Sequence, residues 1–317
     1  MSAGAAPAAA PANRAPEAAP RGLVVAAFIC IYTVWGSTYL AIRYAVATLP
    51  PFLMAGARFL FAGGLMLGWA RLRGAPAPTR REWKSTIIIG ALLLLGGNGG
   101  VVWAETRVTS SLAALLVATV PLWMALGDWL RPRGVRPTAR TALGLALGFG
   151  GVVVLIGPRN LVGGGDVSLA GVIAIMLGCM AWAGGSLYAR SAELPRSPVL
   201  ATGMEMLAGG VLMTLLGLVR SEHVGLTAAA FTPRALAALG YLVVAGSLLG
   251  FTSYVWLLRV STPARVGTYA YVNPVIAVLL GTLIAGETLN PRAALAAVII
   301  VSAVVVIVSA KKEVKVG

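Results

Sequence analysis

The segment from Gly267 to Glu287, GTYAYVNPVIAVLLGTLIAGE, decides how the whole chain is expected to fold. Most of its side chains are apolar, and at about 1.5 Å of helical rise per residue it is long enough to cross a bilayer. It nevertheless carries Tyr269, Tyr271 and Asn273, and Pro274 lies in its first half. Polar groups and helix breaks at membrane depth are tolerated where a helix faces other protein or a cavity. We therefore predict a transmembrane helix that lines an internal path.

Composition places the rest of the chain in the same class. Of the 317 residues, 58% are hydrophobic and only 11% are charged, whereas about 25% are charged in soluble domains. Cys30 and Cys179 lie in apolar runs, and His223 is the single histidine. This set favours neither a disulfide framework nor a metal site or histidine-based catalytic centre. We expect a membrane protein without a metal or cofactor.

Ten apolar stretches of about 18–22 residues follow one another, close to the length that a bilayer demands. Lipid cannot satisfy free backbone groups, so stretches this long are expected to be helices. The fold class is therefore predicted as an all-α polytopic membrane protein with ten transmembrane helices. The predicted spans are 23–42, 51–70, 86–104, 110–130, 138–157, 168–189, 198–218, 236–257, 264–285 and 291–309.

Loop charges predict the orientation. If the N-terminus is cytoplasmic, 18 of the 25 basic residues fall in cytoplasmic segments, six fall outside, and Arg58 remains within the membrane. By the positive-inside rule, both termini are expected in the cytoplasm, as tails over 1–21 and 310–317. The first tail is rich in Ala and Pro and is predicted to be disordered. This bias explains the net charge of +15 without nucleic acid.

The chain divides into two halves of five helices, 22–157 and 168–309, joined by an extracytoplasmic link over 158–167. Because five is odd, the second half must enter the membrane from the opposite side, so the two repeats are inverted. Inverted repeats are typical of transporters, whose substrate site lies near the membrane midplane where the halves meet.

Weak internal similarity supports this division. The sequence RVTS at 107–110 is similar to RVST at 259–262, and each is followed by a proline within a predicted helix, Pro121 or Pro274. Proline removes a backbone hydrogen bond from a helix interior. We predict a helix break or hinge at both prolines.

The order of several short motifs resembles the drug/metabolite transporter superfamily, EamA-domain exporter type. These motifs are WGSTYL (35–40), LPPF (49–52), ARF (57–59), GNG (97–99), WAE (103–105), TYAYVNPV (268–275) and GE (286–287). The resemblance covers residues 22–309 as two EamA-like halves. It implies a bacterial inner-membrane carrier, usually an exporter of amino acids, related metabolites or toxic organic compounds. The sequence departs from the family where Arg133 takes the place at which the first half often has a counterpart of Glu287.

Two charged residues lie deep in predicted helices. Arg58 is about seven residues into the second helix, roughly 10 Å below the outer surface at helical rise, and Glu205 lies 147 positions later. Buried charge is costly and usually marks a transport path. Arg58 either serves that path, snorkels to headgroups or caps backbone carbonyls structurally. Glu205 either binds a substrate amine, takes up a proton or packs structurally.

Uncharged polar and aromatic residues complete the candidate substrate site. Asn98 is flanked by glycines that allow close helix approach. Tyr269 and Asn273 share a helical face and form the best predicted cavity pair. Aromatic side chains with one polar group suit amphipathic solutes, although they also anchor helices at membrane interfaces. The remaining candidates are Trp35, Tyr39, Trp103, Trp182, Tyr188 and Tyr254.

Two further patterns leave alternatives open. Gly144 and Gly148 form a G-x-x-x-G motif that joins helices either within a monomer or between the subunits of a homodimer. Glu105, Asp128 and Asp166 lie near predicted helix ends, where a solvated face or a gate is expected rather than a binding site.

Together these features predict a secondary transporter that exports amino acids, related small metabolites or drug-like compounds by alternating access through a central cavity. Its partners would be a small-molecule substrate, the lipid bilayer and, through Glu205, a coupled proton. The alternatives are an exporter of organic cations or nucleobase-like compounds, a channel, or a sensor. An intramembrane enzyme is not favoured, because the chain contains neither H-E-x-x-H nor G-x-S-x-G.

Overall fold

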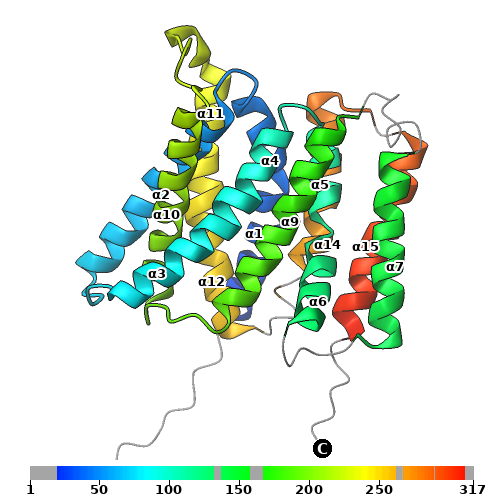
Figure 1. The fold of residues 1–317 in the computed structure, drawn as a ribbon, viewed down its shortest axis with the longest axis horizontal. Helices are drawn as coiled ribbons and strands as arrows, with labels where there is room; N and C mark the ends of the chain where they lie inside the picture. The colour runs from blue at the N-terminus through cyan, green and yellow to red at the C-terminus, as the bar shows by residue number, and fades with distance from the viewer. Residues whose placement is uncertain are drawn as a thin grey trace, which may run out of the picture.

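The computed structural model describes residues 20–131, 137–157, 167–261, 266, 268–288 and 290–310. Every regular element in these residues is helical, which confirms the all-α fold class (Figure 1). The sequence predictions that lie outside them are those on 1–19, on 158–166, on 311–317, on Arg133 and on Asp166.

In its described residues, the first repeat contains seven α-helical segments and one π-helical segment. They are α1 (Arg21–Ala45), α2 (Pro51–Leu72), α3 (Arg80–Ile89), η1 (Gly90–Asn98), α4 (Gly99–Ala104), α5 (Ser110–Val117), α6 (Val120–Leu130) and α7 (Ala139–Ile156). The segments α3, η1 and α4 form one continuous span, Arg80–Ala104, and α5 and α6 form another, Ser110–Leu130.

The second repeat is built in the same order. Its elements are α9 (Leu169–Ala189), α10 (Pro198–Val219), the short 3-10 helix η2 (Ala228–Ala230), α11 (Pro233–Tyr241), η3 (Leu242–Leu249, π-helical), α12 (Gly250–Val260), α14 (Tyr269–Ala285) and α15 (Pro291–Ala310). Among the described residues, eight spans are long and apolar enough to cross a bilayer, and two shorter apolar helices, Tyr269–Ala285 and Pro291–Ile307, complete the ten predicted helices.

One predicted boundary is wrong for a local reason. The third helix begins at Arg80 rather than at residue 86, because Thr79 and Glu82 form a capping box in which each side chain accepts from the other's backbone N–H. Hydropathy detects only the apolar part of this helix. The fourth helix is interrupted between Val117 and Val120, directly before Pro121.

Reciprocal glycine contacts between α2 and α10 demonstrate the inverted repeat. A Cβ added at Gly56 would lie 3.2 Å from the Gly210 carbonyl oxygen, and one added at Gly210 would lie 3.1 Å from the Gly56 oxygen. Gly63 and Gly203 face each other in the same way, at 2.8 and 3.2 Å. Since Gly203 and Gly210 follow Gly56 and Gly63 by 147 positions, a two-fold relation exchanges the halves and sets α2 and α10 antiparallel.

The other contacts between helices are related by the same two-fold exchange of the halves. The helix α1 packs on α14 and on α12, and its counterpart α9 packs on α6 and on α4. The two last helices of the repeats, α7 and α15, lie side by side at one edge, while α2 and α10 lie at the other (Figure 1). At the α7–α15 contact, Gly144 faces Ala303 and Ile307, and Gly148 faces Leu122 of α6. The G-x-x-x-G motif thus joins helices within the monomer.

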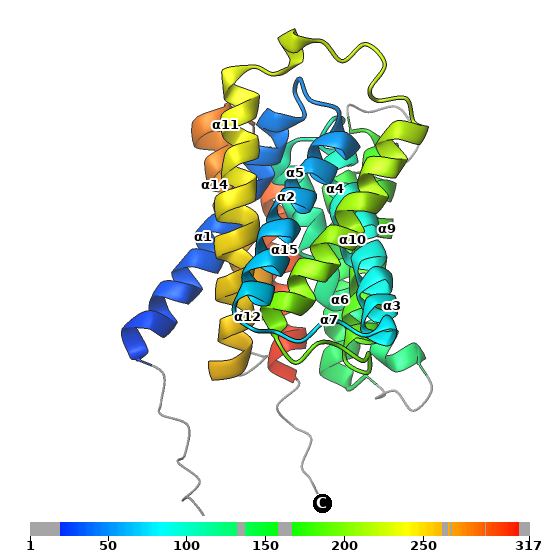
Figure 2. The same ribbon diagram turned by 90° about the vertical axis from the view of Figure 1, so that its left-hand side faces the viewer.

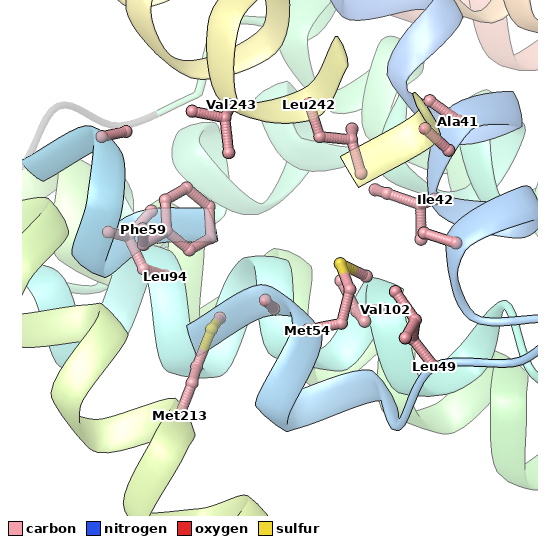
Figure 3. Packing of buried hydrophobic residues seen from close by; sticks show 14 of the residues in the cluster. Ala41, Ile42, Leu49, Met54, Phe59, Leu94, Val102, Met213, Leu242 and Val243 are labelled. Atoms are coloured by element: carbon pink, nitrogen blue, oxygen red, sulfur yellow. The ribbon is translucent and has the colours of Figure 1, made fainter. Parts of the chain in front are cut away.

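A large apolar cluster holds α2 in place as one wall of the bundle interior. It brings Met54 and Phe59 of α2 against Leu94 of η1, Met213 of α10 and Leu242 of η3 (Figure 3). Each of these side chains is buried. The π-helical segment η3 therefore packs on the helix that carries Arg58, while η1 packs on α9 and α10.

The two ends of the bundle are distinct. The helix α1 begins and α15 ends at the same end, which we call the terminal end (Figure 2). The turn from α4 to α5 and the end of α14 lie at the opposite end, which we call the far end.

Candidate functional site: a central cavity between the repeats

A cavity of about 560 Å³ lies between the two repeats. Its volume is in the range that small-molecule sites occupy, roughly 300–1,000 Å³. The lining residues come from both halves, from α1, α2, α4, α5, α6, α9, α12, α14 and α15 and from the end of η1. Near the far end the wall includes Ile42, Val101 and Ala114, and towards the terminal end it reaches Ala189 and Arg190. The cavity follows the path that inverted repeats predict.

Four aromatic side chains form one side of this cavity. The Trp35 ring of α1 lies 5.3 Å from Phe251, 5.2 Å from Tyr254 and 5.2 Å from Tyr269, measured between centroids. Tyr254 and Tyr269 also meet edge to face at 6.0 Å. Such rings offer flat apolar faces together with polar groups. Three helices, α1, α12 and α14, thus build an amphipathic surface.

The π-helical segment η3 supplies polar anchors for this surface. The indole Nε1 of Trp35 donates to the Gly246 carbonyl oxygen at 3.1 Å, and the guanidinium Nε of Arg58 donates to the Ser247 hydroxyl at 2.9 Å. A π-helical turn departs from the regular i→i+4 pattern and occurs frequently at functional sites. Adjacent residues of η3 therefore orient two candidate residues that come from different helices.

Arg58 is a buried cation in the cavity wall. Its residue is 4% exposed, and its guanidinium carbon lies 4.7 Å from the Phe59 ring centroid. Among the described residues, no carboxylate forms an ion pair with it. A buried charge without a counter-ion is costly. This guanidinium is consequently available to an anionic ligand.

A second arginine lines the cavity nearer the terminal end. Arg190 Nη1 lies 3.7 Å from Oδ1 of Asp128, to which Arg131 Nη2 also approaches at 2.6 Å. The Asp128 side chain is 14% exposed, so it is not the solvated group that its position near a helix end suggested. This network connects the end of α6 to the end of α9 beside the cavity.

Both predicted prolines line the cavity, but their helices differ. Pro121 follows the break between α5 and α6, whereas Pro274 lies inside the continuous helix α14. A proline nitrogen has no hydrogen to donate. The carbonyls of Val117 and Ala270, four residues earlier, therefore lose that helical bond, and both residues lie on the cavity wall.

Two amides line the cavity from opposite repeats. The Asn273 amide nitrogen, oriented towards acceptors, donates to the carbonyl oxygens of Tyr269 at 3.3 Å and of Tyr32 at 3.2 Å. Asn98 stands at the end of η1. Beside it, Trp182 packs on Gly97, where an added Cβ would lie 2.7 Å from the ring. Close packing on glycine thus positions Trp182 as well as Asn98.

Comparison with known proteins agrees with this architecture. The model of the EamA-like transporter family matches residues 22–157 and 169–309, which are the two repeats. The chain belongs to the EamA-like transporter family. It is 41% identical to the inner membrane transporter YedA of Escherichia coli (strain K12) over 90% of each chain. The transporter YvbV of Bacillus subtilis (strain 168) is 23% identical, with 85% of this chain and 86% of the relative covered.

A solved crystal structure shows the same fold. It superposes with a TM-score of 0.62 at 19% identity and covers 93% of this chain and 100% of its own. The resemblance inferred from the motifs is therefore confirmed, and this EamA-like protein is a transporter of the drug/metabolite type.

In this EamA-like transporter, the cavity gathers most of the predicted candidates. The ten that line it are Trp35, Tyr39, Arg58, Asn98, Pro121, Trp182, Tyr254, Tyr269, Asn273 and Pro274. Their side chains come from both repeats, as a site between the halves requires.

Three predicted site residues lie elsewhere. Trp103 lines a second, smaller cavity of about 280 Å³, because five residues separate it from Asn98 and place it about 140° away on a helix. Tyr188 does not belong to the cavity wall. It lies six residues after Trp182 and therefore on a different face of α9. Glu205 lies within electrostatic range of Tyr254 but is not among the lining residues.

Several site residues were not anticipated from the sequence. Thr38 lies three residues from Trp35 on the same face of α1, a spacing that could have identified it. Phe251 and Ser247 depend on the π-helical geometry around η3, which hydropathy does not show. Arg190 lies just beyond the predicted span 168–189, although it lines the cavity.

Hydrogen bonds join the two repeats at the far end. Glu287, just after α14, accepts from the backbone N–H groups and hydroxyls of Ser110 and Ser111 at 2.5–3.0 Å. Burial raises the pKa of Glu287, but the bonds from Ser111 and Ser110 outweigh it and leave the pKa below its ordinary value. The ionised carboxylate caps the N-terminus of α5.

A second carboxyl lies in the same region. Glu105 was expected at a solvated face or a gate, but its residue is 1% exposed, so the solvated alternative is wrong. Arg43 of α1 donates from Nη1 to the carbonyl oxygens of Glu105 at 3.1 Å and of Val108 at 2.9 Å. These contacts join α1 to the turn between α4 and α5.

Proposed function

We propose that this chain is a secondary transporter that exports small amphipathic carboxylates, amino acids among them, across the bacterial inner membrane. The observation that carries the proposal is the buried guanidinium of Arg58 in the wall of the central cavity, which has no carboxylate partner among the described residues. Arginine and carboxylate form charge-assisted hydrogen bonds that are stronger than neutral ones. A substrate carboxylate on Arg58 would provide the missing counter-ion.

The aromatic surface would accommodate the apolar part of the same substrate. Trp35, Tyr254 and Tyr269 meet within about 6 Å of one another, and aromatic faces bind apolar and planar groups well. For a zwitterion, the Ala270 carbonyl on the wall of α14 is a candidate acceptor for the ammonium group. Arg58 and Arg190 would repel organic cations, which disfavours that alternative substrate class.

Independent features support the proposed orientation and direction. The positive-inside bias predicts that the terminal end is cytoplasmic, and the cavity reaches that end at Ala189 and Arg190. The name of the relative YedA supports the inner membrane. In this conformation a cytoplasmic solute would enter the cavity, and closure of the terminal end followed by opening of the far end would release it.

A substrate screen tests this function directly. Cells that overproduce the protein are challenged with toxic amino-acid analogues, organic acids and organic cations, and export of each hit is measured from loaded vesicles. We expect protection against carboxylate-bearing compounds and saturable export, which distinguishes a carrier from a channel. Arg58→Gln should abolish protection, while Arg81→Gln, at an exposed arginine, should preserve it. Selective export of cations would contradict the proposal.

A further inference from the structure

Glu105 is a buried carboxyl whose side chain has no hydrogen-bond partner among the described residues. Both carboxyl oxygens lack one, and the residue is 1% exposed. An ionised carboxylate in such surroundings is very unfavourable, and the group neutralises instead. The structure is therefore compatible with a proton on Glu105.

The nearby basic residues do not pair with this carboxyl. Arg43 directs its Nη1 to the backbone oxygens of Glu105 and Val108. Arg107 lies over the Trp103 ring, with its guanidinium carbon 3.8 Å from the ring centroid. Neither arginine forms an ion pair with the Glu105 side chain in the described part of the chain.

Other groups near Glu105 oppose its ionisation or are neutral. Glu287, ionised on the N-terminus of α5, adds a like charge, and Tyr39 of α1 lies within electrostatic range. From α9, the residue against the Ala104 carbonyl is Gly171, which carries no charge. Burial raises the pKa of Glu105 well above its ordinary value, the charge of Arg43 lowers it, and that of Glu287 raises it.

The position of Glu105 connects this proton to closure of the far end. Tyr39 lines the central cavity. Glu105 is the residue directly after α4 and lies within electrostatic range of Tyr39. Arg43, Glu105, Ser110, Ser111 and Glu287 form what we call the far-end clasp, which holds α1, the α4–α5 turn and the end of α14 together. Opening the far end must separate these elements and admit water to Glu105.

We propose that Glu105 is a proton-binding site that controls the far-end clasp: the protonated carboxyl keeps the far end closed, and its proton passes to water when the clasp opens. The proposal rests on alternating access, as in the proposed function. The closed state holds the proton more tightly than the open state, in which water reaches Glu105. Closure is therefore fully stabilised at pH values below the pKa of Glu105 in the open state. This stabilisation is lost as the pH rises towards the pKa of the closed state.

Distance measurements across the clasp test this inference without substrate. Thr106 in the α4–α5 turn and Thr288 after α14 are both exposed, so each is replaced by a spin-labelled cysteine in a protein lacking Cys30 and Cys179. Double electron–electron resonance in nanodiscs then follows the open and closed populations against pH. The ratio of open to closed should rise about tenfold per pH unit between the two pKa values.

Matched variants distinguish a pH response that arises from Glu105 from one that arises from other groups. Glu105→Gln, which mimics the neutral acid, should stay closed over the whole pH range. Glu287→Gln should weaken closure yet retain a response to pH. A pH response that persists unchanged in Glu105→Gln, or no response in the unsubstituted labelled protein, would overturn the inference. Neither result bears on substrate recognition by Arg58, which is measured by binding.

Discussion

The two proline-containing helices of the repeats occupy equivalent places but have different structures. In the first repeat the helix is interrupted between α5 and α6, directly before Pro121. In the second, α14 continues through Pro274 and also carries Tyr269 and Asn273. Both line the cavity. The repeat therefore determines where the helices lie, while individual residues determine which half supplies the chemistry.

Arg58 and Glu205 show the same difference more sharply. They lie 147 positions apart on α2 and α10, the two helices related by the reciprocal glycine contacts. Arg58 lines the cavity, whereas Glu205 does not and instead lies near Tyr254. With opposite charges at matching positions, the inverted repeat places Arg58, but not Glu205, on the cavity wall.

The largest effect is expected for a substitution of Glu205, through which the sequence predicts coupling of transport to a proton. Glu205→Gln should abolish transport driven by an imposed pH gradient in proteoliposomes, because an amide cannot exchange a proton. Substrate binding should change less, because Glu205 does not line the cavity. A variant that still responds fully to the gradient would show that the coupling group lies elsewhere.

The glycine contacts allow the symmetry of the scaffold to be tested. Gly63→Ala and Gly210→Ala, at positions that the two-fold relation exchanges, each place a methyl group within about 3 Å of opposing backbone. Overpacking of this kind costs about 1–3 kcal/mol, and the two variants should lose similar thermal stability in detergent. Gly64→Ala is the control, because nothing lies within 4 Å of an added Cβ there. Unequal losses at Gly63 and Gly210 would contradict the two-fold relation between α2 and α10.

Smaller, several-fold effects are expected at the prolines. Pro121→Ala and Pro274→Ala restore a backbone donor for Val117 and Ala270. Transport should slow more for Pro121→Ala, because that helix is actually interrupted and the new bond would close the break. Pro198→Ala, in the first turn of α10 where proline costs no hydrogen bond, is the control. Equal effects at all three prolines would argue against hinges.

The fold was predictable because a bilayer leaves few choices. Long apolar runs must become helices, and an odd number of helices per repeat must invert the second copy. Arg58 was also predictable, since a charge within an apolar run is conspicuous. The break before Pro121 was expected at the correct helix, whereas the start at Arg80 depends on a capping box outside the apolar run.

Other parts of the site depend on packing that sequence periodicity does not show. Ser247 reaches Arg58 through the π-helical segment η3. Glu105 is buried because three helix ends converge around it, although its place beside a turn suggested exposure. Trp103 and Asn98 share a helix but face different cavities.

The central claim is that Arg58 recognises a carboxylate, and the most direct measurement compares a substrate with its uncharged amide. Binding of both compounds to the purified protein and to Arg58→Gln is measured by titration calorimetry. A charge-assisted hydrogen bond contributes about 1.5–3 kcal/mol, so we predict that the unsubstituted protein prefers the carboxylate by about 10- to 100-fold. Arg58→Gln should lose this preference. An unchanged preference in Arg58→Gln would contradict the account.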